Sequence, residues 1–260
     1  MTIYEVIKRP IVTEKGVSKK DNELYILGGK LCEKMKDYAM AEGSYQKALG
    51  LTSNAQKLSS IYSNMADLDF DQNKDEDGIV NYKMALKYEA SDAWLYSRLV
   101  HHLVAMKHFD EAVEYGEKMM KIADFGVGRD LLAKAYAGQA LFIWNGYLKR
   151  KTRIVTDPEQ DVVAAVCMKA LKYKDSESNC LSLLGSFDLN TATVEKKLDK
   201  AQKAYDYFSR ALKADERPAR RAELVKLQDQ AKSMITQLQG ADGSGRMPSS
   251  SSPGKESSGG

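Results

Sequence analysis

The chain has 260 residues, of which 43% are hydrophobic and 29% charged, and its formal net charge is +3. This length suffices for one large domain or two small ones, and the composition excludes collagen-like, membrane-embedded and wholly disordered chains. Because 39 basic residues are set against 36 acidic ones, no global field indicates nucleic acid as the partner. Proline is absent between Pro10 and Pro158, which favours an all-helical body.

Residues 1–20 are predicted to form an N-terminal arm. Charged residues and Pro10 interrupt any apolar run of signal-peptide length, and no window reaches the ~18–20 apolar residues of a membrane span. We therefore expect a cytoplasmic location and no membrane partner. The segment IKRPIVTEKG at 7–16 is similar to the opening of a ribosomal large-subunit protein near the peptide exit tunnel. Together with the basic LKRKTR at 148–153, it leaves a ribosome- or RNA-associated role as an alternative.

Aromatic and small residues recur over 23–124 with a spacing of 37 and then 34 residues. The recurring residues are Tyr25, Tyr45 and Ala48, then Tyr62, Tyr82 and Ala85, then Tyr96. Each copy accommodates two helices, predicted over 23–35 and 38–51, over 60–72 and 75–89, and over 93–106 and 109–123. An amphipathic helix needs only apolar residues, so the alternation of rings with methyl-sized residues indicates that each ring enters a gap beside an alanine of a neighbouring helix.

This unit resembles the tetratricopeptide repeat (TPR), a pair of antiparallel helices of ~34 residues with small residues at the helix crossings. The family's signature positions are matched by Gly29, Ala41, Tyr45 and Ala48, by Ala66, Gly78, Tyr82 and Ala85, and by Phe109 and Ala112. The third copy departs from the pattern at Gly116, and the family's proline after the second helix is absent. The resemblance implies an all-α fold, a right-handed superhelical solenoid of antiparallel helix pairs.

The repeat becomes irregular after residue 125. Helices are predicted over 128–151 and 157–173, followed by a pair over 176–189 and 197–215 that matches the repeat at Gly185, Ala204, Phe208 and Ala211. A last amphipathic helix over 217–239 is predicted to cap the stack or to mediate a dimer. The repeat domain thus covers 21–239. Residues 240–260 are rich in Gly, Ser and Pro and cannot offset their ordering entropy, so we predict a disordered tail.

Catalytic patterns are missing from the sequence. It has no nucleophile elbow, P-loop, dinucleotide-binding turn or zinc-protease motif. Cys32, Cys167 and Cys180 lack metal-type spacing, and His101 and His108 are separated by about 10 Å of helical rise. We predict that the chain is not an enzyme and uses no cofactor, metal or small-molecule substrate.

The resemblance implies that the first helix of each repeat lines a concave groove that holds a peptide or a partner helix. The predicted groove residues are Lys30, Lys34, Asn64, Asp67, Phe70, Trp94, Arg98 and His101. The leading hypothesis is a protein-interaction scaffold with a protein or peptide partner. Trp94 either anchors that partner or packs on the preceding repeat.

One branch of the TPR family clamps the terminal carboxylate of heat-shock chaperones with five residues. Asn64 and Arg98 match this set, whereas Ile26, Lys30 and Trp94 replace the other three residues. An ammonium, an amide and a guanidinium suit a carboxylate, so a chaperone co-factor with a partial clamp is a second alternative.

Overall fold

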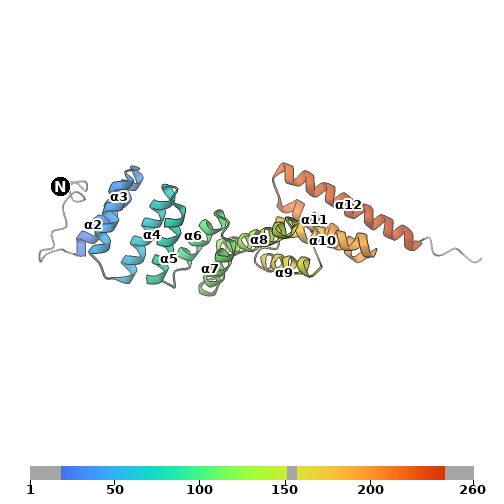
Figure 1. Cartoon of the computed structure of the whole chain (residues 1–260), viewed down its shortest axis with the longest axis horizontal. Helices are drawn as coiled ribbons and strands as arrows, with labels where there is room; N and C mark the ends of the chain where they lie inside the picture. The colour runs from blue at the N-terminus through green and yellow to red at the C-terminus, as the bar shows by residue number, and fades with distance from the viewer. Residues whose placement is uncertain (1–18, 151–156, 244–260) are drawn as a thin grey trace, which may run out of the picture. The chain divides into compact units, whose positions relative to one another are not determined.

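The computed structural model describes residues 19–150 and 157–243, and all regular structure in these ranges is helical. The chain divides into two compact units. The first comprises Met1–Arg153 and Met168–Asp175, and the second comprises Ile154–Cys167 and Ser176–Gly260. Figure 1 shows the helices of both units in chain order. None of the described helices is long and apolar enough to cross a membrane.

Three helix pairs form most of the first unit. They are α2 (Lys19–Lys34) with α3 (Tyr38–Gly50), α4 (Ala55–Asp71) with α5 (Asp75–Tyr88), and α6 (Ala93–Ala105) with α7 (Phe109–Ile122). A longer helix, α8 (Gly126–Leu148), packs on α7 and α6. The predicted pairs are confirmed, although α4 begins five residues early. The Asn54 side chain caps it, accepting a hydrogen bond of 3.0 Å from the amide of Lys57.

Rings pack beside small residues as predicted, but the residues that leave the gaps are glycines and not the predicted alanines. A Cβ atom added to Gly29 would lie 2.5 Å from the fully buried ring of Tyr45. A Cβ on Gly78 would lie 2.7 Å from the ring of Phe70. Glycine is therefore required at these crossings, because any side chain would push the two helices apart.

The turn inside each pair has the same geometry in all three repeats. Its central residue has a positive φ, which is 61° at Lys36, 59° at Asn73 and 64° at Lys107. The next amide donates to the carbonyl five residues back, in the pairs Asp37 to Cys32, Lys74 to Asp69 and His108 to Leu103, at 2.9, 2.8 and 2.9 Å. This is the Schellman ending of a helix, formed here without glycine.

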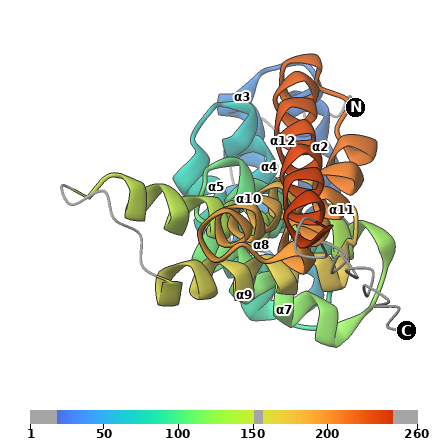
Figure 2. The ribbon, with the colours of Figure 1, turned by 90° about the vertical axis from the view of Figure 1, so that its right-hand side faces the viewer.

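The second unit contains α10 (Ser178–Glu195), α11 (Leu198–Ala214) and α12 (Pro218–Gly243), while α9 (Asp157–Tyr173) is divided between the units. Helix α12 packs on α11 and α10 through the fully buried Leu224 and Ala231. The end-on view in Figure 2 shows α12 beside α11. Helix α10 runs six residues beyond its predicted end, and α12 extends to Gly243. Three predicted segments lie outside the described residues. They are the arm apart from Lys19 and Lys20, residues 151–153 of the basic LKRKTR segment, and the tail from residue 244.

Candidate functional site

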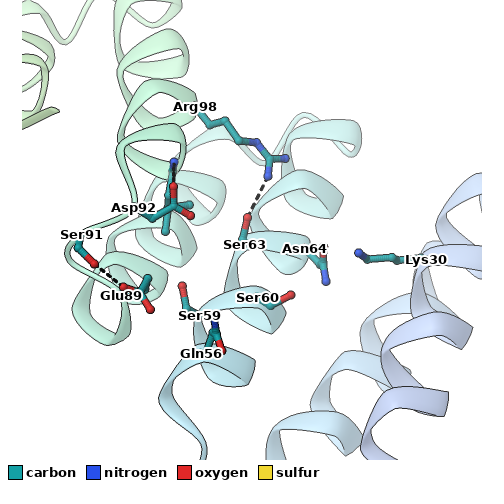
Figure 3. Close-up of a pocket in the computed structure, with 11 residues that line it drawn as sticks. Lys30, Gln56, Ser59, Ser60, Ser63, Asn64, Glu89, Ser91, Asp92 and Arg98 are labelled. Carbon is teal, nitrogen blue, oxygen red and sulfur yellow. Dashed lines mark hydrogen bonds between the residues drawn. The ribbon is translucent and has the colours of Figure 1, made fainter. Parts of the chain in front are cut away.

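A polar cavity of about 530 Å³ opens in the first unit between the first helices of the three repeats. Figure 3 shows its walls, to which α2, α4, α6 and the turn before α6 contribute. The lining residues are Lys30, Gln56, Ser59, Ser60, Ser63, Asn64, Glu89, Ser91, Asp92, Leu95 and Arg98. Hydroxyls, amides and charges thus dominate this surface, which suits a polar ligand better than an apolar one.

Arg98 is held in place by the neighbouring repeat. Its guanidinium donates to Ser63 Oγ at 3.0 Å, forms an ion pair with Asp67, and lies 5.2 Å from the ring centre of Tyr82. The Tyr82 hydroxyl donates to the same Asp67 carboxylate. Burial and this carboxylate raise the pKa of Tyr82 well above its usual range. The partly exposed Arg98 is thus paired with Asp67 across the contact between the second and third repeats.

The equivalent place between the first two repeats lacks such a pair. With the repeat spacing of 37 and 34 residues, Lys30 occupies the position of Asp67, and Asn64 that of Arg98. The Lys30 side chain is exposed, and Figure 3 shows the side chains of Lys30 and Asn64 pointing toward one another. The Nδ2 atom of Asn64 is buried without a hydrogen-bond partner among the described residues. Neighbouring first helices therefore place two donors here, and among the described residues the Asn64 amide nitrogen has no acceptor within hydrogen-bond distance.

An acidic group neighbours this basic corner. The Glu33 carboxylate accepts a hydrogen bond of 3.0 Å from the Tyr45 hydroxyl. Burial raises the pKa of Glu33, and the carboxylates of Asp67 and Asp71 raise it further. The first helices thus present both signs of charge on one side of the stack, which would orient a ligand that carries a dipole or an end charge.

The other predicted groove residues do not line the cavity. Phe70 stacks on His102, with ring centres 3.5 Å apart, and fills the gap at Gly78. Trp94 is 63% exposed and contacts the ring of Phe125 at 5.0 Å between centres. Lys34 and His101 are exposed, and Asp67 acts through Arg98. Of the eight predicted residues, Lys30, Asn64 and Arg98 are the ones that the cavity brings together.

Sequence reasoning missed two groups of lining residues. On α4, Ser59 and Ser60 lie about one turn before Ser63 and Asn64, and Gln56 lies about two turns before them, so the helical period could have placed them on this face. Residues 89–92 belong to the turn between α5 and α6, and the repeat spacing does not predict where the side chains of a turn point. Among the described residues, no group of three His, Cys, Asp or Glu side chains could hold a metal ion. All three cysteines are buried and unpaired.

No protein-family model matches the chain, and no curated protein sequence does. Solved structures resemble it at low identity. A TPR repeat protein from Bacteroides fragilis is 19% identical, with a TM-score of 0.51 and coverage of 82% of this chain and 99% of that one. MamA from Desulfovibrio magneticus RS-1 is 14% identical, with a TM-score of 0.47 and coverage of 76% and 97%. YrrB, described as a TPR protein with an unusual peptide-binding site, is 17% identical, with a TM-score of 0.46 and coverage of 76% and 93%.

These likenesses concern the fold alone, and the Bacteroides protein carries the comparison because its TM-score exceeds 0.5. Its length is covered almost completely by this chain, and both are built from helical repeats. The chain therefore has the fold of a TPR-like helical repeat protein.

Proposed function

We propose that this protein is a non-enzymatic interaction scaffold, which binds a peptide or a helix of a partner protein along α2, α4 and α6. One observation carries the proposal. The position that holds the Asp67–Arg98 ion pair between the second and third repeats holds two donors, Lys30 and Asn64, between the first and second. A buried donor without a partner costs about 1–3 kcal/mol, and a ligand that brings an acceptor removes this cost.

The chemistry of the cavity defines the ligand more closely. A carbonyl or carboxylate oxygen would accept from Asn64 Nδ2 and from the Lys30 ammonium. Main-chain carbonyls of an extended peptide offer such acceptors at regular intervals, and a terminal or side-chain carboxylate offers a charged one. The serines of α4 supply further hydroxyls along the wall. The exposed ring of Trp94 lies outside the cavity and could anchor an apolar side chain of the same partner.

The experiment is an affinity pull-down from cytosolic extract, read by mass spectrometry at low and moderate salt. The test variants are Lys30→Glu and Lys30→Glu/Arg98→Glu. The matched control is Lys87→Glu/Lys121→Glu, which reverses the same number of charges on exposed positions of the second helices α5 and α7. Partners kept by the control and lost by both test variants support the proposal. Partner sets that are the same for all four proteins contradict it. The single variant guards against misfolding, because it leaves the Asp67–Arg98 pair intact.

The chaperone co-factor role is a narrower form of the same proposal, favoured by the presence of Lys30, Asn64 and Arg98 in one cavity. It requires a free terminal carboxylate. A synthetic peptide with an acidic C-terminus should then bind at least tenfold more tightly than its amidated form, which corresponds to about 1.4 kcal/mol. Equal affinity would exclude the chaperone role and leave the general scaffold unaffected.

A further inference from the structure

Helix α2 and the residue after it carry a stripe of exposed apolar side chains. Leu24 is 37% exposed, Leu27 53%, Leu31 42% and Met35 69%. Their spacing of three, four and four residues places them on one side of the helix. This side differs from the one that packs on α3, where Tyr25 and Cys32 are buried. We call these four residues the α2 stripe.

The repeat spacing shows what such a face normally contacts. Leu24 and Leu31 correspond to Ile61 and Leu68, which lie 37 residues later on α4. Both α4 residues are buried, in one cluster with Tyr45 of α3, the second helix of the preceding repeat. Among the described helices, α2 has no preceding repeat and packs on α3 and α4. The α2 stripe is therefore a face prepared for a helix-like apolar element that the described residues do not provide.

We propose that residues 1–18 of this chain occupy the α2 stripe and close the N-terminal end of the repeats. The segment joins α2 at Lys19, and it contains apolar residues throughout its length, namely Ile3, Tyr4, Val6, Ile7, Ile11, Val12 and Val17. By contrast, residues 244–260 contain one hydrophobic residue, Met247. Of the two termini outside the described ranges, the N-terminal one has the composition that the stripe requires.

Length and tethering support the same occupant. The α2 stripe extends over twelve residues, from Leu24 to Met35, about 16 Å of helical rise. Eighteen residues can reach roughly 60 Å when extended, so the segment is long enough to reverse direction and follow the stripe. Because residues 1–18 are covalently attached beside the stripe, their effective concentration there is roughly millimolar, as is typical of short linkers. A partner in another molecule would have to compete with it. Terminal repeats need such a cover to hide their inner faces from water.

The test uses the full chain with a photoreactive benzoylphenylalanine in place of Leu27, on the stripe. The control carries the same group in place of Val80, which is 57% exposed on α5. We expect cross-links from position 27 to peptides within residues 1–18, and none to them from position 80. An equal mixture of isotopically light and heavy protein identifies which molecule supplies the peptide. Cross-links within one molecule support the proposal. Cross-links between copies, cross-links to a different protein, or none from position 27 overturn it.

A second measurement tests the same contact without a probe. Leu27→Glu places a charge on the α2 stripe, and Val80→Glu is the matched control at a similarly exposed position. We expect the amides of residues 3–12 to exchange with deuterium about tenfold faster in Leu27→Glu than in the wild type or the control. Equal exchange in all three proteins overturns the proposal. Both substitutions replace exposed residues, so both variants should retain the helical circular dichroism of the wild type.

Discussion

Gly29→Ala tests whether the ring-and-glycine crossings hold the repeats together. The added Cβ would lie 2.5 Å from Cε1 and 2.8 Å from Cδ1 and Cζ of the Tyr45 ring. Carbon atoms in contact prefer about 3.5–4.0 Å, so the ring must withdraw by roughly 1 Å. The surrounding structure opposes this movement of the ring, because Tyr45 is fully buried and its hydroxyl donates to Glu33 at 3.0 Å.

The magnitude follows from two opposed terms. Alanine is favoured over glycine inside a helix by about 1 kcal/mol, whereas overpacking a buried site costs typically 1–3 kcal/mol. Three ring atoms are affected, so we expect a cost near the upper end and a net loss of about 2 kcal/mol. Gly43→Ala is the matched control. This glycine lies inside α3 with no atom within 4 Å of an added Cβ, so the same substitution should gain about 1 kcal/mol there.

Urea unfolding followed by tryptophan fluorescence measures the difference. Trp94 and Trp144 are the chain's two tryptophans and both belong to the first unit, so the signal reports on that unit alone. With a slope of about 2 kcal/mol per molar urea, the two variants should differ by roughly 1.5 M in midpoint. A Gly29→Ala midpoint equal to that of Gly43→Ala would refute the packing argument. The substitution Tyr45→Leu should reduce the cost of Gly29→Ala, because it removes the ring.

Three further predictions follow from the local geometry. Lys107→Gly should stabilise the first unit by about 1 kcal/mol in the same urea assay, since φ is 64° there and glycine adopts this conformation without strain. Hydrogen bonds from Arg217, and then from Ser178, hold the pKa of buried Asp215 well below its usual range. The contribution of Asp215 to the free energy of unfolding is therefore complete above about pH 4 and is lost as the pH falls further. Asp215→Asn should therefore cost about 2 kcal/mol at pH 7 and flatten the acid side of the stability profile, measured by circular dichroism. The double substitution Lys30→Asp/Asn64→Arg should create a second inter-repeat ion pair and reduce partner recovery in the pull-down at least fivefold, about 1 kcal/mol. Unchanged recovery would mean that these two positions do not contact the ligand.

Much of the fold could be predicted from the sequence because the repeat spacing is visible in large and small residues. Tyr45 and Tyr82 mark the second helices, and Gly29 and Gly78 lie where the rings enter. The predicted end of α10 was wrong by six residues for a local reason. Residues 190–197 contain no glycine or proline that would mark the end, and the helix terminates at Lys196 with a φ of 58°.

The candidate site was less accessible to sequence reasoning. The resemblance to the TPR family implied that Lys30, Asn64 and Arg98 line one groove, but it could not show that Arg98 is paired with Asp67 of another helix. Phe70 illustrates the same difficulty. It was predicted to line the groove, whereas its ring turns toward Gly78 and His102. Side-chain direction depends on the neighbouring repeat, and the spacing of residues along one helix does not contain that information.

The groove and the packing of the repeats use the same positions. Asp67 accepts from the Tyr82 hydroxyl of its own repeat and from Arg98 of the next one, so one carboxylate joins a core ring to an inter-repeat contact. One repeat earlier, Lys30 and Asn64 occupy these positions without completing the contact. Stability alone would favour a second ion pair there. An interface left with two donors costs folding free energy, as functional sites commonly do, and a ligand with an acceptor would restore the missing contact. Binding at this site should therefore also tighten the contact between the first two repeats, because the ligand joins α2 to α4.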